Sequence, residues 1–306
     1  MATFLDRFHW LLDPNFDQRT KIQLLQGWRL LADRPNCANC NNRMSLERRP
    51  TCNDGYRWRC HARVCRRTRG LRVGTVFEGI EFDLGKLTVI LYFWTLQQTG
   101  ATIIRQTGIN KNVLSKLRAR LRSVCTLDLA ANPIHIDGSN NWVVEIDESM
   151  FHHKQRANRG RRARRAIWVF GMVDTRYTPA RPLMEVVPNR ARRTLIPIIN
   201  RVLRGQNVII HSDMWRGYIN LPMFVPRCRT HQTVNHSRNF VDPVTGAHTQ
   251  HIESCWNRVK YHIKKQKGCR RTHLQSYLNE FMWFDWRGGN DRFQSIVTAI
   301  NGVYVV

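Results

Sequence analysis

Acidic residues are scarce in this chain. Its 306 residues include 22 Asp and Glu against 49 Lys and Arg, which gives a formal net charge of +27 and a pI near 10.9. A positive excess of this size is typical of proteins that bind a polyanion, because lysine and arginine release counterions from phosphates. An anionic membrane surface is the alternative partner for such a basic chain.

Long apolar runs are absent as well. A membrane-spanning helix needs roughly 18 or more apolar residues, and the best candidate, 84–96, is shorter and is interrupted by Lys86. The first residues lack the basic-then-apolar layout of a signal peptide. We therefore expect an intracellular protein without a membrane segment, whose nine cysteines are reduced or metal-bound. A hydrophobic content of 42% is enough for two or more cored units.

A helical segment is predicted over residues 1–35. Apolar residues recur at helical spacing through 4–33, with a break at Asp13-Pro14. Two close cysteine pairs follow this segment and define the next unit of the chain.

The cysteine pairs are Cys37-Ala-Asn-Cys40 and Cys60-His-Ala-Arg-Val-Cys65. Their spacing predicts a zinc ribbon over residues 36–78, in which four thiolates hold a tetrahedral ion in place of a large core. The second pair is wider than usual, so Cys52 and His61 are alternatives for the fourth ligand. Four unrelated buried cysteines are the other interpretation of this pattern.

Arginines surround these cysteines. They are Arg43, Arg48, Arg49, Arg57, Arg59, Arg63, Arg66, Arg67, Arg69 and Arg72. A solvated protein face would mix charges of both signs, so this nearly uniform positive charge favours contact with DNA phosphates.

Residues 79–135 are predicted to be helical and to contain a helix-turn-helix. A short helix from Ala101, a turn at Gly108 and a second, basic helix suit a unit whose second helix enters the major groove. The side chains of this helix that we expect to contact DNA are Lys116, Arg118 and Arg122. A helical hairpin that only packs would produce a similar pattern.

The remaining part, residues 140–306, is predicted to be an α/β catalytic domain with a ribonuclease-H-like fold. Its apolar segments predict three strands, a helix and a fourth strand, over residues 143–147, 166–174, 182–187, 194–203 and 208–211. Three antiparallel strands followed by a helix and a strand beside the first are the layout of this fold. The first and fourth strands are then neighbours.

Three acidic residues come together in such a fold. Asp147 and Asp213 lie at the ends of these neighbouring strands, and Glu253 lies near the start of a helix. Hard oxygen ligands of this kind hold two Mg²⁺ or Mn²⁺ ions for phosphodiester chemistry. The inward residues of the helix are predicted to be Ile252, Trp256, Val259 and Ile263. This leaves Glu253 and Lys260 on an adjacent face that can meet metals and DNA.

Other interpretations of the acidic residues remain open. Each one taken alone fits a turn, a helix cap or a solvated position. The competing acids are Glu145, Glu148, Asp174 and Glu185. Nearby histidines, His211, His236, His248 and His251, fit either a phosphate-orienting role or structural hydrogen bonding.

Several motifs make the chain resemble a known family. They are the cysteine ribbon with Gly74-Thr-Val-Phe77, and residues 144–149, 168–171, 211–218, 234–250 and 252–256. On these residues the chain resembles the DDE transposases of the Merlin superfamily of eukaryotic cut-and-paste transposons, and their ISXO-like bacterial relatives. The resemblance implies that Asp147, Asp213 and Glu253 are the catalytic triad. Residues 234–250 resemble the eukaryotic branch, which implies a nuclear protein.

An arginine-rich stretch, 156–165, is denser in charge than this family leads us to expect. Its residues predicted to contact phosphates are Arg161, Arg162, Arg164 and Arg165. A nuclear localisation signal and a solvated loop are the alternatives.

Together these features predict a DNA transposase. It is expected to bind the terminal repeats of a transposon and its target DNA as a dimer or higher homo-oligomer, with two divalent ions and a structural zinc. A ribonuclease-H-like nuclease without strand transfer and a domesticated DNA-binding protein are the rival functions. A purely architectural basic protein would not need the strand-end acids.

Overall fold

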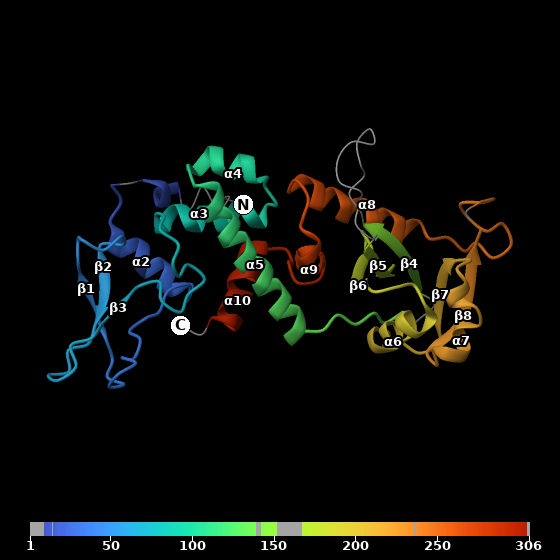
Figure 1. The fold of residues 1–306 in the computed structure, drawn as a ribbon, viewed down its shortest axis with the longest axis horizontal. Helices are drawn as coiled ribbons and strands as arrows, with labels where there is room; N and C mark the ends of the chain where they lie inside the picture. The colour runs from blue at the N-terminus through green and yellow to red at the C-terminus, as the bar shows by residue number, and fades with distance from the viewer. Residues whose placement is uncertain (1–8, 14, 139–141, 152–166, 236, 305–306) are drawn as a thin grey trace. The chain divides into compact units, whose positions relative to one another are not determined.

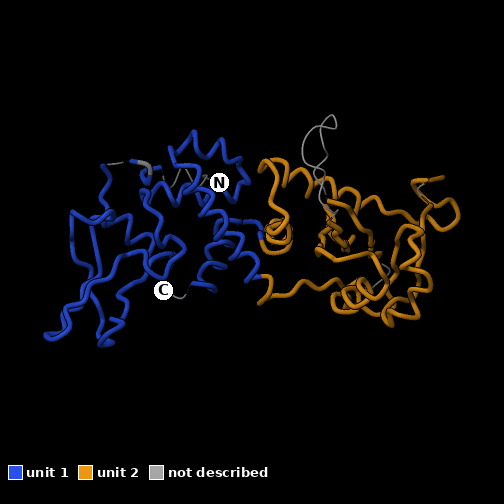
Figure 2. Tube along the Cα trace, viewed as in Figure 1, with its two compact units in different colours: residues 1–128, 288–306 blue, residues 129–287 orange. Residues whose placement is uncertain are grey.

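The structure of the chain is a computed structural model that describes residues 9–13, 15–138, 142–151, 167–235 and 237–304. The chain forms two compact units (Figure 2). The first consists of residues 1–128 and 288–306, and the second of residues 129–287. Within the described ranges, no helix is long and apolar enough to cross a membrane.

Short helices and a small sheet open the first unit (Figure 1). The helices are η1 (His9–Leu12) and α2 (Gln18–Gly27). The sheet consists of β1 (Ser45–Arg48), β2 (Tyr56–Arg59) and β3 (Thr68–Gly70), which pair antiparallel in that order. Strands this short bury little apolar surface, so the sheet needs a further source of stability.

Helices form the rest of the first unit. They are α3 (Leu84–Thr95), α4 (Gly100–Thr107), α5 (Lys111–Ala131) and α10 (Arg292–Val303). Gly108 ends α4 with a φ of 73°, a conformation that favours glycine, and turns the chain toward α5. The structure therefore contains the short helix, glycine turn and second helix that the sequence predicts.

The position of α10 corrects the predicted boundary of the catalytic domain. Residues 288–306 belong to the first unit and not to a domain over 140–306. The ring of Phe293 lies 5.2 Å from that of Trp28 and 6.4 Å from that of Tyr92. Asn301 Nδ2 donates a hydrogen bond to Trp28 O at 3.1 Å. The apolar face of α10 is buried in this unit because α2 and α3 offer matching apolar surface.

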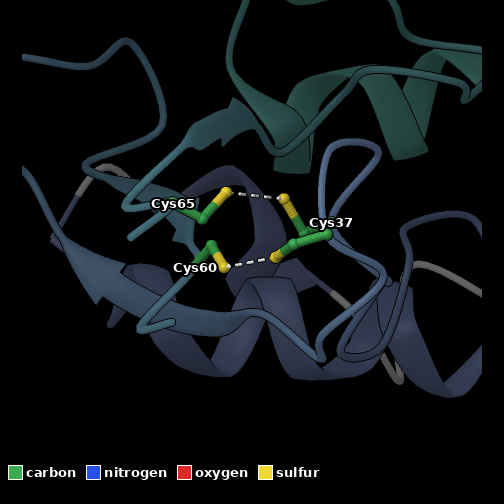
Figure 3. Close-up of side chains that lie close together, drawn as sticks. Cys37, Cys60 and Cys65 are labelled. Carbon is green, nitrogen blue, oxygen red and sulfur yellow. Dashed lines mark hydrogen bonds between the residues drawn. The ribbon is translucent and has the colours of Figure 1, made fainter. Parts of the chain in front are cut away.

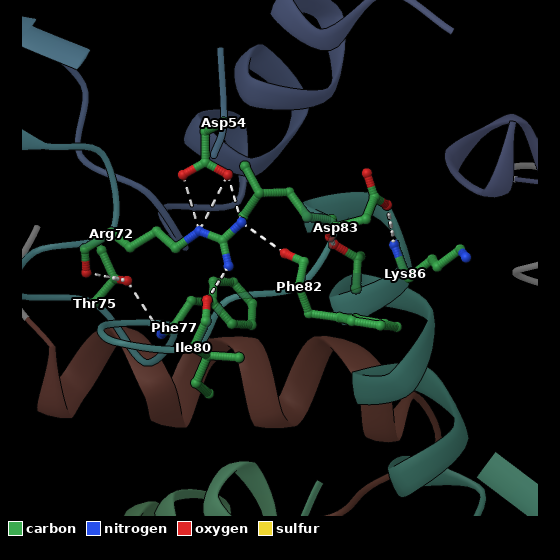
Figure 4. Close-up of polar contacts among 10 residues, drawn as sticks. Asp54, Arg72, Thr75, Phe77, Ile80, Phe82, Asp83 and Lys86 are labelled. Atoms are coloured by element: carbon green, nitrogen blue, oxygen red, sulfur yellow. Dashed lines mark hydrogen bonds and ion pairs between the residues drawn. The ribbon is translucent and has the colours of Figure 1, made fainter. Parts of the chain in front are cut away.

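A buried ion pair connects the small sheet to the start of α3 (Figure 4). The Arg72 guanidinium pairs with the Asp54 carboxylate, and both side chains are buried. Arg72 also donates hydrogen bonds to Ile80 O and, at 2.7 Å, to Phe82 O. Buried charges need this complete pairing. Arg72, which the sequence analysis groups with the DNA-contacting arginines, is therefore buried and serves the fold.

The second unit is built on a five-stranded sheet with the order β6-β5-β4-β7-β8. The strands are β4 (Val143–Phe151), β5 (Ile167–Asp174), β6 (Arg181–Val187), β7 (Val208–Asp213) and β8 (Cys228–Val234). β5 is antiparallel to both β4 and β6, whereas β7 runs parallel to β4 and β8 parallel to β7. This is the ribonuclease-H-like arrangement that the sequence predicts, with β8 as an additional edge strand.

Helices pack on this sheet. The unit contains α6 (Arg192–Val202), η2 (Arg216–Tyr218), α7 (Leu221–Phe224), α8 (Gln250–Lys265), η3 (Arg271–His273) and α9 (Leu274–Trp286). α8 contacts β4, β5 and β6, and α9 contacts β6. The predicted inward residues of α8, from Ile252 to Ile263, are buried. Side chains of β4 alternate between the two faces of the sheet, so α8 meets only every second one.

Candidate active site and metal-binding clusters

The register of the central strands brings Asp147 and Asp213 together. β4 and β7 are parallel, and Glu145 is paired with His211. Two residues further along both strands, on the same face, are Asp147 and Asp213. Asp213 is the last residue of β7, and its Oδ1 accepts a hydrogen bond from Trp215 N at 3.0 Å.

Glu253 joins them from the first turn of α8. Thr249 Oγ1 lies 3.3 Å from Glu253 Oε1. The charges of Asp213 and Glu253 both raise the pKa of Asp147, which shows that the three acids share one electrostatic environment. Within the described chain they do not gather all their ligand atoms within 4.8 Å of one another. Like charges repel at such a site until a cation compensates them.

The Asp147 carboxylate is the most strongly perturbed of the three. Its pKa is raised from 3.8 to about 6, chiefly by burial and also by the charges of the neighbouring acids, although a hydrogen bond from Trp256 lowers it. A carboxylate that is costly to ionise in the free protein gains most from a bound divalent ion. The three carboxylates therefore fit hard divalent cations such as Mg²⁺.

Trp256 holds Asp147 through a contact that the sequence does not reveal. Its Nε1 donates a hydrogen bond to Asp147 Oδ2 at 2.9 Å. Gly171 on β5 is paired with Asp147, and a Cβ added there would lie 2.6 Å from the Trp256 ring. Glycine is needed at this position because the indole ring occupies the space above it. Trp256 was expected only to pack, and it also orients a carboxylate.

Glu148 lies on the opposite face of β4. It accepts a hydrogen bond from Tyr218 Oη, and its Oε2 lies 3.9 Å from Arg190 Nη1. Burial raises the pKa of Glu148 from 4.5 to about 7. The Arg190 guanidinium is 4.0 Å from the ring centroids of both Trp168 and Trp215. Glu148 is therefore held in a packed polar network on the other face of the strand, although the charges of Asp147 and Asp213 also raise its pKa.

Glu145 anchors the start of α8. It is fully buried, and its Oε2 accepts a hydrogen bond from Ile252 N at 3.0 Å. Its Oε1 lies 2.6 Å from His251 Nδ1 and 3.2 Å from His248 Nδ1. Of the competing acids, Asp174 is also accounted for, since it is fully buried and pairs with Arg176 at 2.6 Å.

The four predicted zinc ligands come together in the first unit (Figure 3). Cys37 Sγ lies 3.6 Å from Cys65 Sγ, and Cys40 Sγ lies 3.4 Å from Cys60 Sγ. The four sulfur atoms lie within 4.8 Å of one another. This arrangement fits the ligand shell of one tetrahedral ion.

The fourth member of this cluster is Cys65. Of the two alternatives, Cys52 is not a member of the four-sulfur group, and His61 Nε2 lies 2.6 Å from Ser45 Oγ. The turn before Cys65 brings its thiol back toward the first pair, since Cys65 N donates to Ala62 O at 2.9 Å. The cysteine pair Cys60 and Cys65, although more widely spaced in sequence than usual, therefore still completes the four-sulfur cluster.

Comparison with known protein families assigns the second unit. Residues 135–285 match the profile of the ISXO2-like transposase domain. The second unit belongs to the ISXO2-like transposase family. No match was found among curated proteins.

Two solved structures are similar to the transposase chain at low identity. One is the simian T-cell lymphotropic virus intasome in complex with PP2A regulatory subunit B56 gamma, with 13% identity, coverage of 64% of this chain and 67% of that chain, and a TM-score of 0.32. The other is the Mos1 strand transfer complex, with 12% identity, coverage of 71% and 78%, and a TM-score of 0.31. The assignment of the transposase domain rests on the family match and the strand order.

The residues of α5 that were predicted to contact DNA differ in position. Lys116 is exposed, although its Nζ donates to Gly79 O at 2.8 Å. Arg118 Nη2 donates to Gln98 O at 2.7 Å, and Arg122 is only 9% exposed. Arg122 is thus buried and Arg118 partly buried beside the leucines of α5, so both pack within the first unit, and their contact with DNA stays a prediction.

Other predicted DNA contacts of the transposase lie on α8 or outside the described residues. Lys260 is exposed on α8, with its Nζ 5.6 Å from the centroid of the Phe151 ring. The remaining four, Arg161, Arg162, Arg164 and Arg165, lie outside the described residues.

Proposed function

We propose that the protein is a DNA transposase that binds transposon ends, cleaves phosphodiester bonds with two divalent metal ions and joins the freed 3′-hydroxyl to target DNA. The observation that carries this proposal is the placement of Asp147, Asp213 and Glu253 on one face of the ribonuclease-H-like sheet. The family match supplies the transposase class, and the three acids supply the chemistry.

Each acid has a distinct role in this proposal. When bound, two Mg²⁺ or Mn²⁺ ions would supply activation of the attacking oxygen and stabilisation of the leaving oxygen. Asp147 would be the ligand shared by both ions, because the charges of both other carboxylates act on it, and Asp213 and Glu253 would each hold one ion. Trp256 fixes the Asp147 carboxylate by a hydrogen bond to its Oδ2 atom. The position of that oxygen is therefore set before substrate arrives.

The first unit is proposed to bind DNA. Its cysteine cluster holds a structural zinc ion, which replaces the apolar core that three short strands cannot provide. The exposed side of α5, with Lys116, is the part of the helix-turn-helix that can face a major groove. Lys260 and the arginines of 156–165 are proposed to contact phosphates.

Cellular context follows the sequence resemblance. We propose that the protein is a nuclear member of the Merlin superfamily and acts as a homo-oligomer on its DNA. A nuclease without strand transfer is the rival function, since it would use the same three acids. A domesticated DNA-binding protein would tolerate their loss.

Alanine substitutions of Asp147, Asp213 and Glu253 test the proposal. Each should lower Mg²⁺-dependent cleavage and joining of labelled transposon ends by at least about 10²–10³-fold, since each removes a group that stabilises developing charge. DNA binding in a gel-shift titration should persist, because no phosphate contact is removed. If the wild-type protein cleaves the labelled ends but does not join them to target DNA, the nuclease function is favoured.

The control is Glu185→Gln. Glu185 is a partly exposed acid on β6 that pairs with Arg201, outside the three-acid site. Glu145 and Glu148 are unsuitable controls, since the first anchors α8 and the second is bonded to Tyr218. An Asp213→Ala protein that cuts as well as Glu185→Gln would move the active site elsewhere.

A further inference from the structure

A second group of metal-ligand residues lies beside the three acids. It consists of Glu145, His248 and His251, whose ligand atoms all lie within 4.8 Å of one another. Glu145 Oε1 is 2.6 Å from His251 Nδ1 and 3.2 Å from His248 Nδ1. The function proposed above does not use these three side chains.

The group is held in place by contacts on its outer side. Glu145 is fully buried, and Ile252 N donates to its Oε2 at 3.0 Å, so that Oε1 is directed toward the histidines. The backbone N and O of His248 lie 3.3 Å and 3.2 Å from His211 Nδ1. His211 Nε2 lies in turn 2.9 Å from Gln232 Oε1. Metal ligands typically have outer contacts of this kind, which fix their orientation.

One atom of the group has no hydrogen bond. His248 Nδ1 is buried and, in the described structure, makes no hydrogen bond, although Glu145 Oε1 is close to it. A buried imidazole nitrogen without a partner is costly. A cation bound between this nitrogen and the carboxylate would remove that cost.

The donor set identifies the class of ion. Two imidazole nitrogens with one carboxylate oxygen suit zinc and similar transition metals, whereas Mg²⁺ prefers oxygen ligands alone. Zinc bonds of about 2.0–2.2 Å place tetrahedral ligand atoms roughly 3.3 Å apart. The distance from Glu145 to His248 is already near this value, and the distance to His251 must widen by less than about 1 Å.

We propose that Glu145, His248 and His251 form a second transition-metal site, of the zinc class, distinct from the cysteine cluster and from the three acids. Glu145 precedes Asp147 by two residues on β4, and His251 precedes Glu253 by two on α8. An ion at this site would fasten the start of α8 to β4 and fix the separation of Asp147 and Glu253. The site itself does not depend on the transposase function.

Metal content of the full chain tests this site. After dialysis against excess Zn²⁺ and removal of unbound metal, mass spectrometry should find two zinc ions per wild-type chain. His251→Asn and His248→Gln should each bind one fewer, because three ligands are reduced to two. His251 is about half exposed, so its replacement does not threaten folding. His273→Asn changes an exposed histidine outside the group and should keep both ions.

Cobalt distinguishes the two sites. Co²⁺ in the cysteine cluster gives thiolate-to-metal charge-transfer absorption, which Cys40→Ser should abolish, whereas Co²⁺ at the histidine site gives none. In the Cys40→Ser protein, His251→Asn should remove the remaining ion. Equal zinc content in the wild type, His251→Asn and His248→Gln would overturn the proposal and leave the histidines as hydrogen-bonding residues. That result would not affect the three-acid site, which DNA cleavage tests separately.

Discussion

The cysteine cluster and the three-acid site are assembled over different distances along the chain. The four cysteines lie in two tight turns between residues 37 and 65. Asp147, Asp213 and Glu253 lie on β4, β7 and α8, and only the order of the strands brings them together. A local cluster is visible in residue spacing, whereas a site made by topology requires the fold to be known first.

The two regions also differ in what holds them in shape. The strands of the three-stranded sheet bury a single large side chain, Trp58, so an ion at the cysteines would contribute directly to folding. The second unit has an extensive core formed by its five strands and helices. Its acids are a cost to stability, as the raised pKa of Asp147 shows. Loss of a cysteine ligand should therefore unfold the three-stranded sheet, whereas loss of one of the three acids should inactivate the second unit without unfolding it.

The largest expected effect is that of Cys40→Ser. Structural zinc contributes on the order of 10 kcal/mol to the folding of small zinc-binding units, so the sheet β1–β3 should unfold when one of the four thiolates is removed. Hydrogen exchange should show loss of protection in β1–β3, while β4–β8 stay protected. Cys52→Ser, outside the cluster, should leave exchange unchanged. Retained protection and zinc content in Cys40→Ser would remove the contrast between the two regions.

An intermediate effect is expected for Trp256→Phe. The ring keeps its place over Gly171, but the hydrogen bond to Asp147 is lost. Cleavage should fall by about 10–100-fold, as for other contacts that orient a metal ligand. Because this bond lowers the pKa of Asp147, its loss raises that pKa and should move the acid limb of the pH–rate profile to higher pH.

Trp286→Phe is the matched control for this prediction. Its Nε1 donates to Pro182 O at 2.7 Å, so it loses a comparable bond outside the three-acid site. An equal loss of activity in both variants, with no change in the pH profile, would show that Trp256 acts only through packing.

The smallest expected effects distinguish the roles of two neighbouring basic residues on α5, Lys116 and Arg118. Lys116→Ala should weaken DNA binding, lower the salt slope by about one unit and leave the melting temperature nearly unchanged. Arg118→Ala should instead lower the stability of the first unit by about 1 kcal/mol, since it removes a hydrogen bond to Gln98 O. Gel shifts over a salt series and thermal melts measure both. A reversed pattern would restore Arg118 as a DNA contact.

Residue pattern alone was enough for much of the fold. Apolar, β-branched runs predicted β4, β5, β6 and β7, and the spacing of apolar residues predicted α8. β8 was not predicted, because its sequence, Cys-Arg-Thr-His-Gln-Thr-Val, is largely polar and only its two end residues are buried. An edge strand with partly exposed faces has a weak apolar signal.

The contacts around the acids were less accessible to prediction. Glu145 and Asp147 share one face of β4, which the alternation of a strand implies. The role of Glu145 as an anchor for Ile252 N depends on how α8 lies on the sheet, and spacing does not determine that. For the packing of Arg118 and Arg122 a signal was present, since Arg118 lies one helical turn after the buried Leu114 and Arg122 one turn before the buried Cys125.

The connection through α10 bears on the order in which the molecule can fold during synthesis. The first unit consists of residues 1–128 and 288–306, so its last helix is made only after the whole transposase domain. Until Phe293 reaches Trp28 and Tyr92, the apolar surface of α2 and α3 that packs against α10 stays uncovered, although the two helices can already contact each other. The second unit, contiguous in sequence, can complete its sheet while the first unit is still open. On the ribosome, the segment that begins first is thus expected to finish last.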